Sequence, residues 1–188
     1  MAIKTFTSGE VLTASDTNTF LANSGLVYVA GGTFAAATIV DVTGFSSAYK
    51  TYRLVYQARR TDGAGNIGAS AQFRSSTTPQ ASGYYYGSSY SNYLGATGSL
   101  AAGNNVTSMG FWGGADSASP PNLQTYDISL LQAQGVTWTG GGWYSGASYS
   151  WFYGGAVSTS LTIDRLRVSY GSPGSVTGYW QLYGYREP

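Results

Sequence analysis

Hydrophobic and polar residues alternate along much of the chain, with the period of two that a half-buried β-strand requires. The clearest example is the segment TYRLVYQARR at residues 51–60, in which aromatic and aliphatic side chains occupy every second position. The turn-forming sequence DGAGN at 62–66 follows, and IGASAQFR at 67–74 alternates again. Two alternating segments joined by turn residues predict a β-hairpin with a long loop.

Similar short segments recur elsewhere along the chain. Further strands are predicted at residues 36–42, 107–112, 125–131, 148–153, 160–169 and 176–185. In the segment 160–169 the alternation changes face near Leu166, and a β-bulge is one explanation. About eight to ten short strands separated by Gly-rich turns predict an all-β fold, a jelly-roll-like β-sandwich.

One long segment, residues 75–105, lacks clear alternation and is rich in Tyr, Ser and Gly. We predict a loop here, and loops longer than about 12–15 residues are commonly functional or disordered. The tyrosines favour a functional loop, because disordered segments are poor in aromatic residues.

The first 25 residues carry the one convincing helix signal. Thr13 can cap a helix over residues 14–23, and the Ser-Gly pair that follows can end it. The apolar residues in and just before this helix are Val11, Leu12, Phe20 and Leu21. A ten-residue helix with so small an apolar face is marginal alone, so it should pack on its own domain or on another chain. The predicted organisation is an N-terminal segment at 1–25 and one domain at 26–188.

The composition excludes several classes of protein. Charged residues make up 9% of the chain, compared with about 25% in an average soluble domain, and the net charge is +1. So few basic residues give no electrostatic basis for nucleic-acid binding. No segment has the roughly 20 apolar residues that span a membrane, and the start MAIKTFTSGEV lacks the apolar core of a secretory signal. An uncharged surface of Ser, Thr, Gly, Asn and Tyr suits an oligomer or a part of a larger particle, because few charges need desolvation at the contacts.

The search for catalytic chemistry finds little. The chain contains neither His nor Cys, which excludes His-based triads and the common metal clusters. Asp127 and Asp164, both on predicted strands, are the carboxylate pair that could meet as in a glycosidase. Alternatively, these acidic residues cap turns or pair with Arg53, Arg165 or Arg167. DGAGN lacks the further acidic residues of a calcium-binding loop. We therefore expect no catalytic site, no metal and no cofactor.

The aromatic segments are the remaining functional signal. They are GYYYGSSYSNY at 83–93, FWGG at 111–114 and GVTWTGGGWYSGASYSWFYGG at 135–155. An aromatic ring offers a flat face that can stack on the C–H groups of a sugar, and Tyr adds a hydroxyl group for hydrogen bonding. The candidate glycan-binding or receptor-binding residues are Tyr84, Tyr85, Tyr86, Tyr90, Trp112, Trp143 and Tyr144.

The alternative is that aromatic residues fill the core or a subunit interface. Within 148–153 the alternation places Tyr149, Trp151 and Tyr153 on one face, which favours a buried strand. The preceding sequence TGGGWYSGA, residues 139–147, is predicted to be a loop that holds Trp143 and Tyr144.

Two pieces of the sequence resemble virion proteins of tailed bacteriophages. FTSGEVLTASDTNTFLAN at 6–23 is similar to the FTAGEVLTAADVN-type opening of phage tail fibre and minor tail proteins, and it departs at Thr17, where an apolar residue is more usual. VDVTGFSSAYKTYRLVYQARRTDGAGNIGASAQFR at 40–74, together with the ending LYGYR at 182–186, resembles a recurrent phage domain. The resemblance implies a structural or receptor-binding protein of the virion that forms a homotrimer. It carries no catalytic residues to this chain.

These observations lead to one main hypothesis. The chain is expected to be a tail fibre or minor tail protein, assembled in the host cytoplasm and released by lysis, with a short N-terminal helical attachment segment and a domain that can bind a host-surface glycan. The residues expected to attach it to other virion proteins are Phe6, Val11, Leu12, Phe20 and Leu21. No nucleic-acid partner and no membrane insertion are expected.

Two other hypotheses remain open. The chain could be a head decoration or head-fibre protein bound to the capsid shell, in which case its aromatic residues would have no affinity for sugar. A glycan depolymerase is the weakest hypothesis, because such enzymes are usually much longer and carry paired carboxylates.

Overall fold

The chain folds into two antiparallel β-sheets that pack face to face, which confirms the predicted all-β sandwich. The computed structural model describes Gly9 and residues 25–62, 66–92, 100–116, 122–131, 135–144, 149–171 and 175–185. The helix predicted at 14–23 lies outside these residues. No helix in the described part of the chain is long and apolar enough to cross a membrane.

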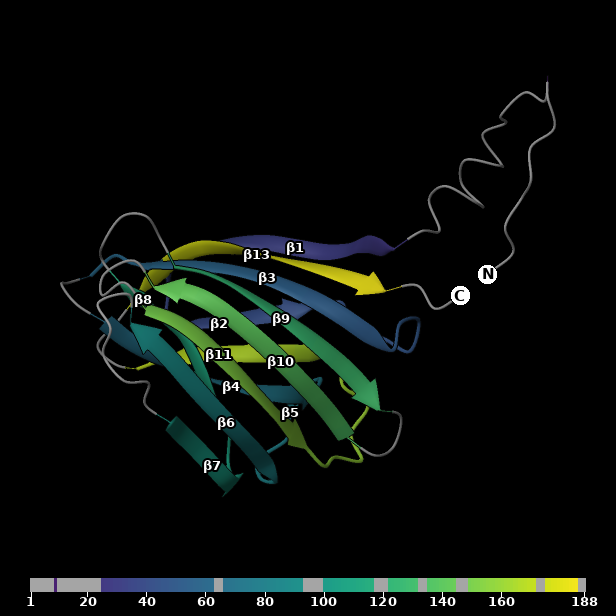
Figure 1. The fold of residues 1–188 in the computed structure, drawn as a ribbon. Coiled ribbons are helices and arrows are strands. Elements are labelled where there is room, and N and C mark those ends of the chain that lie inside the picture. Colours follow the sequence, from purple (N-terminus) through teal and green to yellow (C-terminus); the bar gives the residue numbers. More distant parts are fainter. Residues whose placement is uncertain are drawn as a thin grey trace.

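The larger sheet has eight strands, which follow one another from β1 at the top of Figure 1 to β7 at the bottom. In spatial order they are β1 (Leu26–Ala37), β13 (Val176–Tyr185), β3 (Thr51–Arg60), β9 (Asn122–Leu131), β10 (Gly135–Tyr144), β11 (Tyr149–Val157), β6 (Tyr84–Asn92) and β7 (Leu100–Val106). The smaller sheet has five strands. They are β2 (Ile39–Thr43), β12 (Arg165–Tyr170), β4 (Asn66–Ser75) and β5 (Thr78–Pro79) in spatial order, with β8 (Met109–Asp116) also paired to β4.

Eight of these strands have the connectivity of a jelly roll. The first and last pair with each other, β1 with β13, and the pairs β2–β12, β3–β9 and β4–β8 follow inward along the chain. The contacts β13–β3 and β12–β4 then join these pairs into two sheets. Nested antiparallel pairs divided between two sheets are the pattern of the jelly roll.

Four further strands, β6, β7, β10 and β11, are insertions into the jelly roll, and we call them the added strands. β6 and β7 lie between β4 and β8 along the chain, whereas β10 and β11 lie between β9 and β12. The two insertions pair with each other through β6 and β11, and β10 pairs with β9. Segments far apart in the sequence therefore extend the larger sheet together (Figure 1).

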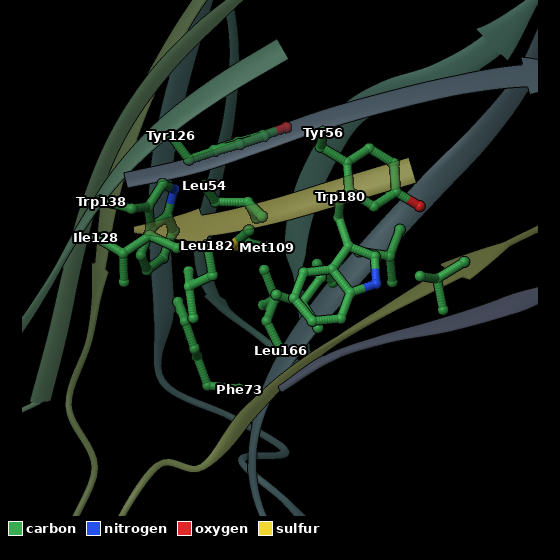
Figure 2. Packing of buried hydrophobic residues seen from close by; sticks show 14 of the residues in the cluster. Leu54, Tyr56, Phe73, Met109, Tyr126, Ile128, Trp138, Leu166, Trp180 and Leu182 are labelled. Carbon is green, nitrogen blue, oxygen red and sulfur yellow. The ribbon is translucent and has the colours of Figure 1, made fainter. Parts of the chain in front are cut away.

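The hydrophobic core lies between the two sheets. Leu54 and Leu182 of the larger sheet, and Phe73 and Leu166 of the smaller sheet, are fully buried and face one another (Figure 2). The predicted face of β3, with its buried Tyr, Leu, Tyr and Ala, is confirmed. Full burial of one such side chain stabilises the fold by about 1.5–3 kcal/mol, so this core is the main source of stability.

Several aromatic rings of the larger sheet lie over a glycine of the neighbouring strand. At Gly155 of β11, a Cβ atom would come within 2.5 Å of the Trp138 ring on β10. The rings of Tyr126 and Tyr153 meet across Gly140, with their centroids 5.1 Å apart. A side chain at either glycine would displace a ring. The high content of Gly and Tyr in this chain thus has a cause in packing.

The predicted hairpin between residues 51–60 and 67–74 is wrong. Both strands exist, as β3 and β4, but they belong to different sheets. β3 already pairs with β13 on one side and with β9 on the other, so β4 has no place beside it. The connection between them instead crosses from one sheet to the other.

Two predicted loops also prove to be strands. The segment 75–105 contains β5, β6 and all but the last residue of β7, and residues 139–144 belong to β10. Gly and Ser have low strand propensity, but here aromatic residues from neighbouring strands cover the glycines, and packing outweighs propensity. The change of face near Leu166 is the start of β12 and not a bulge. The segment 36–42 spans the end of β1 and most of β2, and the first ten residues of β1 were not predicted.

Candidate functional site

The structure separates the three consecutive tyrosines 84–86, all of which were predicted to contact a ligand. Tyr84 is 0% exposed, and its hydroxyl oxygen accepts a hydrogen bond of 2.8 Å from the backbone N–H of Phe73 in the smaller sheet. Burial raises the pKa of this hydroxyl group. The prediction that Tyr84 contacts a glycan is therefore contradicted, because its ring lies inside the sandwich.

Tyr85 and Tyr86 are consecutive residues of a strand, so their side chains point to opposite faces of the sheet. The ring of Tyr86 is partly buried against the core and lies over Gly103 of β7. Tyr85 points to the opposite face and is 50% exposed. Of these three tyrosines, Tyr85 is therefore the one whose ring is most available to a partner.

The other predicted site residues have described backbones only. Tyr90 lies on β6 opposite Trp151, Trp112 lies on β8, and Trp143 and Tyr144 end β10. Their side chains lie outside the described part of the molecule. The predicted attachment residues Phe6, Val11, Leu12, Phe20 and Leu21 also lie outside it.

The outer face of the added strands, which points away from the core, carries two exposed rings. Phe152 of β11 is 64% exposed and Tyr85 of β6 is 50% exposed. Tyr85 is in register with Ala156, so Phe152 lies four positions away along β11 on the same face. From strand geometry, the Cα atoms of Tyr85 and Phe152 are on the order of 14 Å apart. Gly87 and Gly154, which pair with each other, lie between them, so no side chain stands between the two rings.

A shallow groove of about 620 Å³ crosses this face beside Phe152. Its floor is β10 at Gly140–Gly142, where the strand has no side chains, and β9 and β11 form its two sides. The Phe152 ring leans over Gly141, since a Cβ atom there would lie 3.5 Å from the ring. The remaining side chains that point to this face are Leu123, Thr125, Asp127, Thr139 and Ser150. The groove thus combines one aromatic ring with three hydroxyl groups and a carboxylate.

The carboxylate of Asp127 is held by its neighbours on β3 and β13. Arg53 donates two hydrogen bonds to it, at 2.8 and 2.9 Å, and the Tyr185 hydroxyl donates a third at 3.3 Å. The Arg53 guanidinium keeps the pKa of Asp127 below its usual value. Asp127 therefore stays ionised at neutral pH and offers the groove a fixed hydrogen-bond acceptor.

The two carboxylates considered for catalysis do not form a pair. Asp127 binds Arg53 in the larger sheet, whereas Asp164 binds Arg165 beside the smaller sheet and accepts a hydrogen bond from the Ser76 backbone N–H. The pKa of Asp164 is also lowered; its burial opposes this, and its hydrogen bonds to Arg165 and Ser76 cause it. A general acid needs a raised pKa, so neither group is prepared for that role. Within the described residues, no three acidic, His or Cys side chains gather as a metal site would need.

Sequence reasoning missed most of the groove. Phe152 was overlooked because the alternation within 148–153 drew attention to the opposite face, where Tyr153 is buried and Trp151 packs against the core. The same alternation predicts that Phe152, between Trp151 and Tyr153, points to the outer face of the sheet. The glycines of β10 could not be recognised as a groove floor without knowledge that β9 and β11 flank them.

No family model, no curated protein and no solved structure gives a match to this chain.

Proposed function

We propose that this protein is a structural protein of a tailed-bacteriophage particle, of the tail fibre or minor tail type, which contacts a host-surface glycan through the outer face of its added strands. The N-terminal segment would attach the chain to other virion proteins, and the sandwich would assemble as a homotrimer. The resemblance of residues 6–23 to the opening of phage fibre proteins supports the virion assignment. We propose no catalytic role.

One observation carries the glycan assignment. Two separate insertions, neither of which contains a charged residue on its strands, meet to form one flat face with an exposed ring at Phe152 and another at Tyr85. Exposed aromatic rings beside hydroxyl groups suit a sugar, which presents C–H groups on its faces and hydroxyl groups at its edges. None of the described residues that line the groove is a cation, which favours a neutral glycan.

The first experiment tests contact with the glycan. Saturation-transfer NMR should show that neutral oligosaccharides prepared from the host surface bind the full-length chain, and titration calorimetry gives the affinity. Phe152→Ala should weaken binding about tenfold, as expected when a ring worth about 1.4 kcal/mol is lost. Ile39→Ala is the matched control, because Ile39 is 51% exposed but lies on the smaller sheet. Equal affinity of the Phe152 variant and the wild-type chain would reject the site.

The second experiment tests the position on the particle. An antibody to this chain should label the tail of intact virions in electron micrographs. Label on the capsid surface instead would favour a head decoration protein, and the uncharged face would then be a contact with the shell. Absence of the protein from purified virions would reject both assignments.

A further inference from the structure

Asp127 is the one charged residue among the described residues that line the groove. It lies on β9 in register with Arg53 of β3 on one side and with Thr139 of β10 on the other. Residues that lie opposite each other in neighbouring strands point to the same face of the sheet. The carboxylate therefore stands at the border between the jelly-roll strands and the added strands, on the side of the sheet that faces away from the core.

The Asp127 carboxylate has room for one more hydrogen bond. A carboxylate offers about four acceptor sites, two on each oxygen. Its Oδ1 accepts a hydrogen bond of 2.8 Å from Nε of Arg53 and one of 3.3 Å from the Tyr185 hydroxyl. Its Oδ2 accepts one of 2.9 Å from a second nitrogen of Arg53, and no other described group donates to it. The side chain is 40% exposed, so a ligand in the groove can reach the site that remains on Oδ2.

The residues that hold the carboxylate are themselves held in place. The Arg53 guanidinium lies 5.7 Å from the centroid of the Tyr185 ring, which is within the range of a cation–π interaction. Two parallel N–H···O bonds from one guanidinium also fix the plane of the carboxylate. Because Arg53 keeps the pKa of Asp127 low, the carboxylate is ionised at neutral pH and can accept hydrogen bonds but donate none. An acceptor that is fixed in advance loses little entropy when a ligand binds.

The carboxylate and the Phe152 ring lie within reach of one sugar residue. Asp127 is opposite Thr139 of β10, and Phe152 is opposite Gly141, two positions further along the same strand. The Phe152 ring leans over Gly141, so it lies one strand and two residues away from Asp127, on the order of 8 Å by strand geometry. A pyranose ring with its hydroxyl groups covers a distance of this order. Its C–H face can lie on the Phe152 ring while a hydroxyl group at its edge donates to Asp127.

We infer that Asp127 is a specificity-determining residue of the groove, which selects a neutral sugar whose hydroxyl group beside the C–H face is free and rejects the same sugar when that group is acylated. This inference rests on the proposed function and names the form of the glycan that the groove would bind.

The physical basis of this selection is the chemistry of the acceptor. An ester oxygen has no hydrogen atom to donate, so an acylated sugar would place its lone pairs against those of Asp127. A site that hydrogen-bonds a hydroxyl group of its ligand rejects an analogue that lacks the hydrogen, because the polar group of the site is left unpaired. Water still reaches the carboxylate, which reduces this penalty, so we expect a preference of about tenfold for the free form.

The test uses neutral oligosaccharides from the host surface in two forms, one freed of esters by mild alkali and one acetylated with acetic anhydride. Titration calorimetry with the full-length chain should show that the free form binds about tenfold more tightly. Added bulk could also weaken binding, and Asp127→Asn separates the two causes. Arg53 can only donate, so it would hold the amide oxygen and leave the amide NH₂ group, a donor, towards the groove. That donor suits the carbonyl oxygen of an acetyl group, so the two forms should then bind within about twofold of each other.

Asp41→Asn is the matched control. Asp41 also accepts two hydrogen bonds from one arginine, Arg167, at 2.7 Å each, but it lies on the smaller sheet. This variant should keep the tenfold preference, and both variants should keep the circular dichroism spectrum of the wild-type chain. Equal affinity of the wild-type chain for the two forms, or an undiminished preference in the Asp127→Asn variant, would overturn the inference and leave the proposed function intact. Binding of neither form, or no loss of affinity for the free form in Phe152→Ala, would overturn both.

Discussion

The jelly-roll strands and the added strands share one sheet but are built from different residues. The ion pairs that the structure describes lie on or beside the jelly-roll strands: Arg53–Asp127, Arg60–Asp62, Arg165–Asp164 and Arg167–Asp41. The added strands come from residues 75–115 and 128–163, which contain no charged residue. One continuous sheet can therefore change its surface chemistry from charged to neutral between β9 and β10.

The difference extends to the way each part is held together. Aliphatic and aromatic side chains from both sheets fill the space between the two layers of jelly-roll strands, as Figure 2 shows. The added strands contribute Val136, Trp138 and Val157 to the same core, and tyrosine hydroxyl groups and rings over glycines join them to the rest in addition. Tyr153 of β11 donates a hydrogen bond of 2.8 Å to Tyr126 of β9, which in turn donates one of 2.6 Å to Gln124. The Tyr84 hydroxyl links β6 to β4 in the smaller sheet.

An uncharged sheet face with exposed rings can therefore be firmly attached to the rest of the fold. Glycines leave the outer face flat, and on the inner face they admit the rings that fix the strands. The same residue type thus serves both faces of the sheet. It follows that the two parts should unfold together, and three measurements can test that expectation.

The largest effect is expected at high pH. Among the described residues, five tyrosines with buried side chains have a hydroxyl pKa that burial raises above the ordinary value of 10.0, and two of the five lie in added strands. They are Tyr56, Tyr84, Tyr126, Tyr153 and Tyr170. Because the unfolded chain loses these protons near pH 10 and the folded chain retains them, stability is fully present below pH 10 and falls as the pH rises. Each such tyrosine removes up to about 1.4 kcal/mol of the unfolding free energy per pH unit.

Phenolate absorbance and circular dichroism should therefore show one sharp alkaline transition in which both parts unfold. Between about pH 5 and 9 stability should be nearly constant, because the chain has neither His nor Cys. Tyr28→Phe, at a position that is 58% exposed, should leave the alkaline transition unchanged. Ionisation of some buried tyrosines before the loss of the remaining structure would show that the added strands separate first.

A smaller effect is expected from one glycine of the added strands. In Gly155→Ala the new methyl group would lie 2.5 Å from the Trp138 ring and closer still to the backbone oxygen of Tyr85. Such overpacking costs about 1–3 kcal/mol of the unfolding free energy. Gly87→Ala is the matched control, because no atom lies within 4 Å of its Cβ position, and it should change stability by less than about 0.5 kcal/mol.

Hydrogen exchange can show which strands lose stability when Gly155 is replaced by alanine. If the sheet is one cooperative unit, protection should decrease in β1 and β13 as much as in β10 and β11. Faster exchange confined to the added strands would mean that they open independently of the jelly roll. Equal stability of the two alanine variants would contradict the role assigned to rings over glycines.

The limits of sequence reasoning follow the same division. The jelly-roll strands with clear alternation, β3 and β13, have the bounds that the pattern predicts, because one face of each meets the core. The alternation says nothing about partners, so β3 and β4 were wrongly joined as a hairpin. For β6, nearly all of β7 and the second half of β10 the sequence pattern predicts loops, because Gly and Ser disfavour strands on their own, whereas part of β11 is predicted as a strand at 148–153. Their stability depends on pairing between β6 and β11, which are more than fifty residues apart and which no local pattern connects.

The smallest effect is expected from the charges that distinguish the jelly-roll surface. Arg53 and Asp127 form a two-fold hydrogen-bonded pair, but both side chains are 40% exposed, so water screens their attraction. A double-mutant cycle of Arg53→Gln and Asp127→Asn should give a coupling free energy of about 0.2–1 kcal/mol that declines with added salt. Because the pKa of Asp127 is lowered in the folded chain, this coupling is present above the ordinary pKa of 3.8 and disappears as the pH falls below the folded value. A coupling free energy near zero would still be consistent with a pair that only positions Asp127 at the groove. A coupling free energy above about 2 kcal/mol would mean that the stability of the jelly roll depends on its surface charges. In the expected range, surface ion pairs contribute little to the stability of the jelly roll, so the lack of charge on the added strands costs the protein almost no stability.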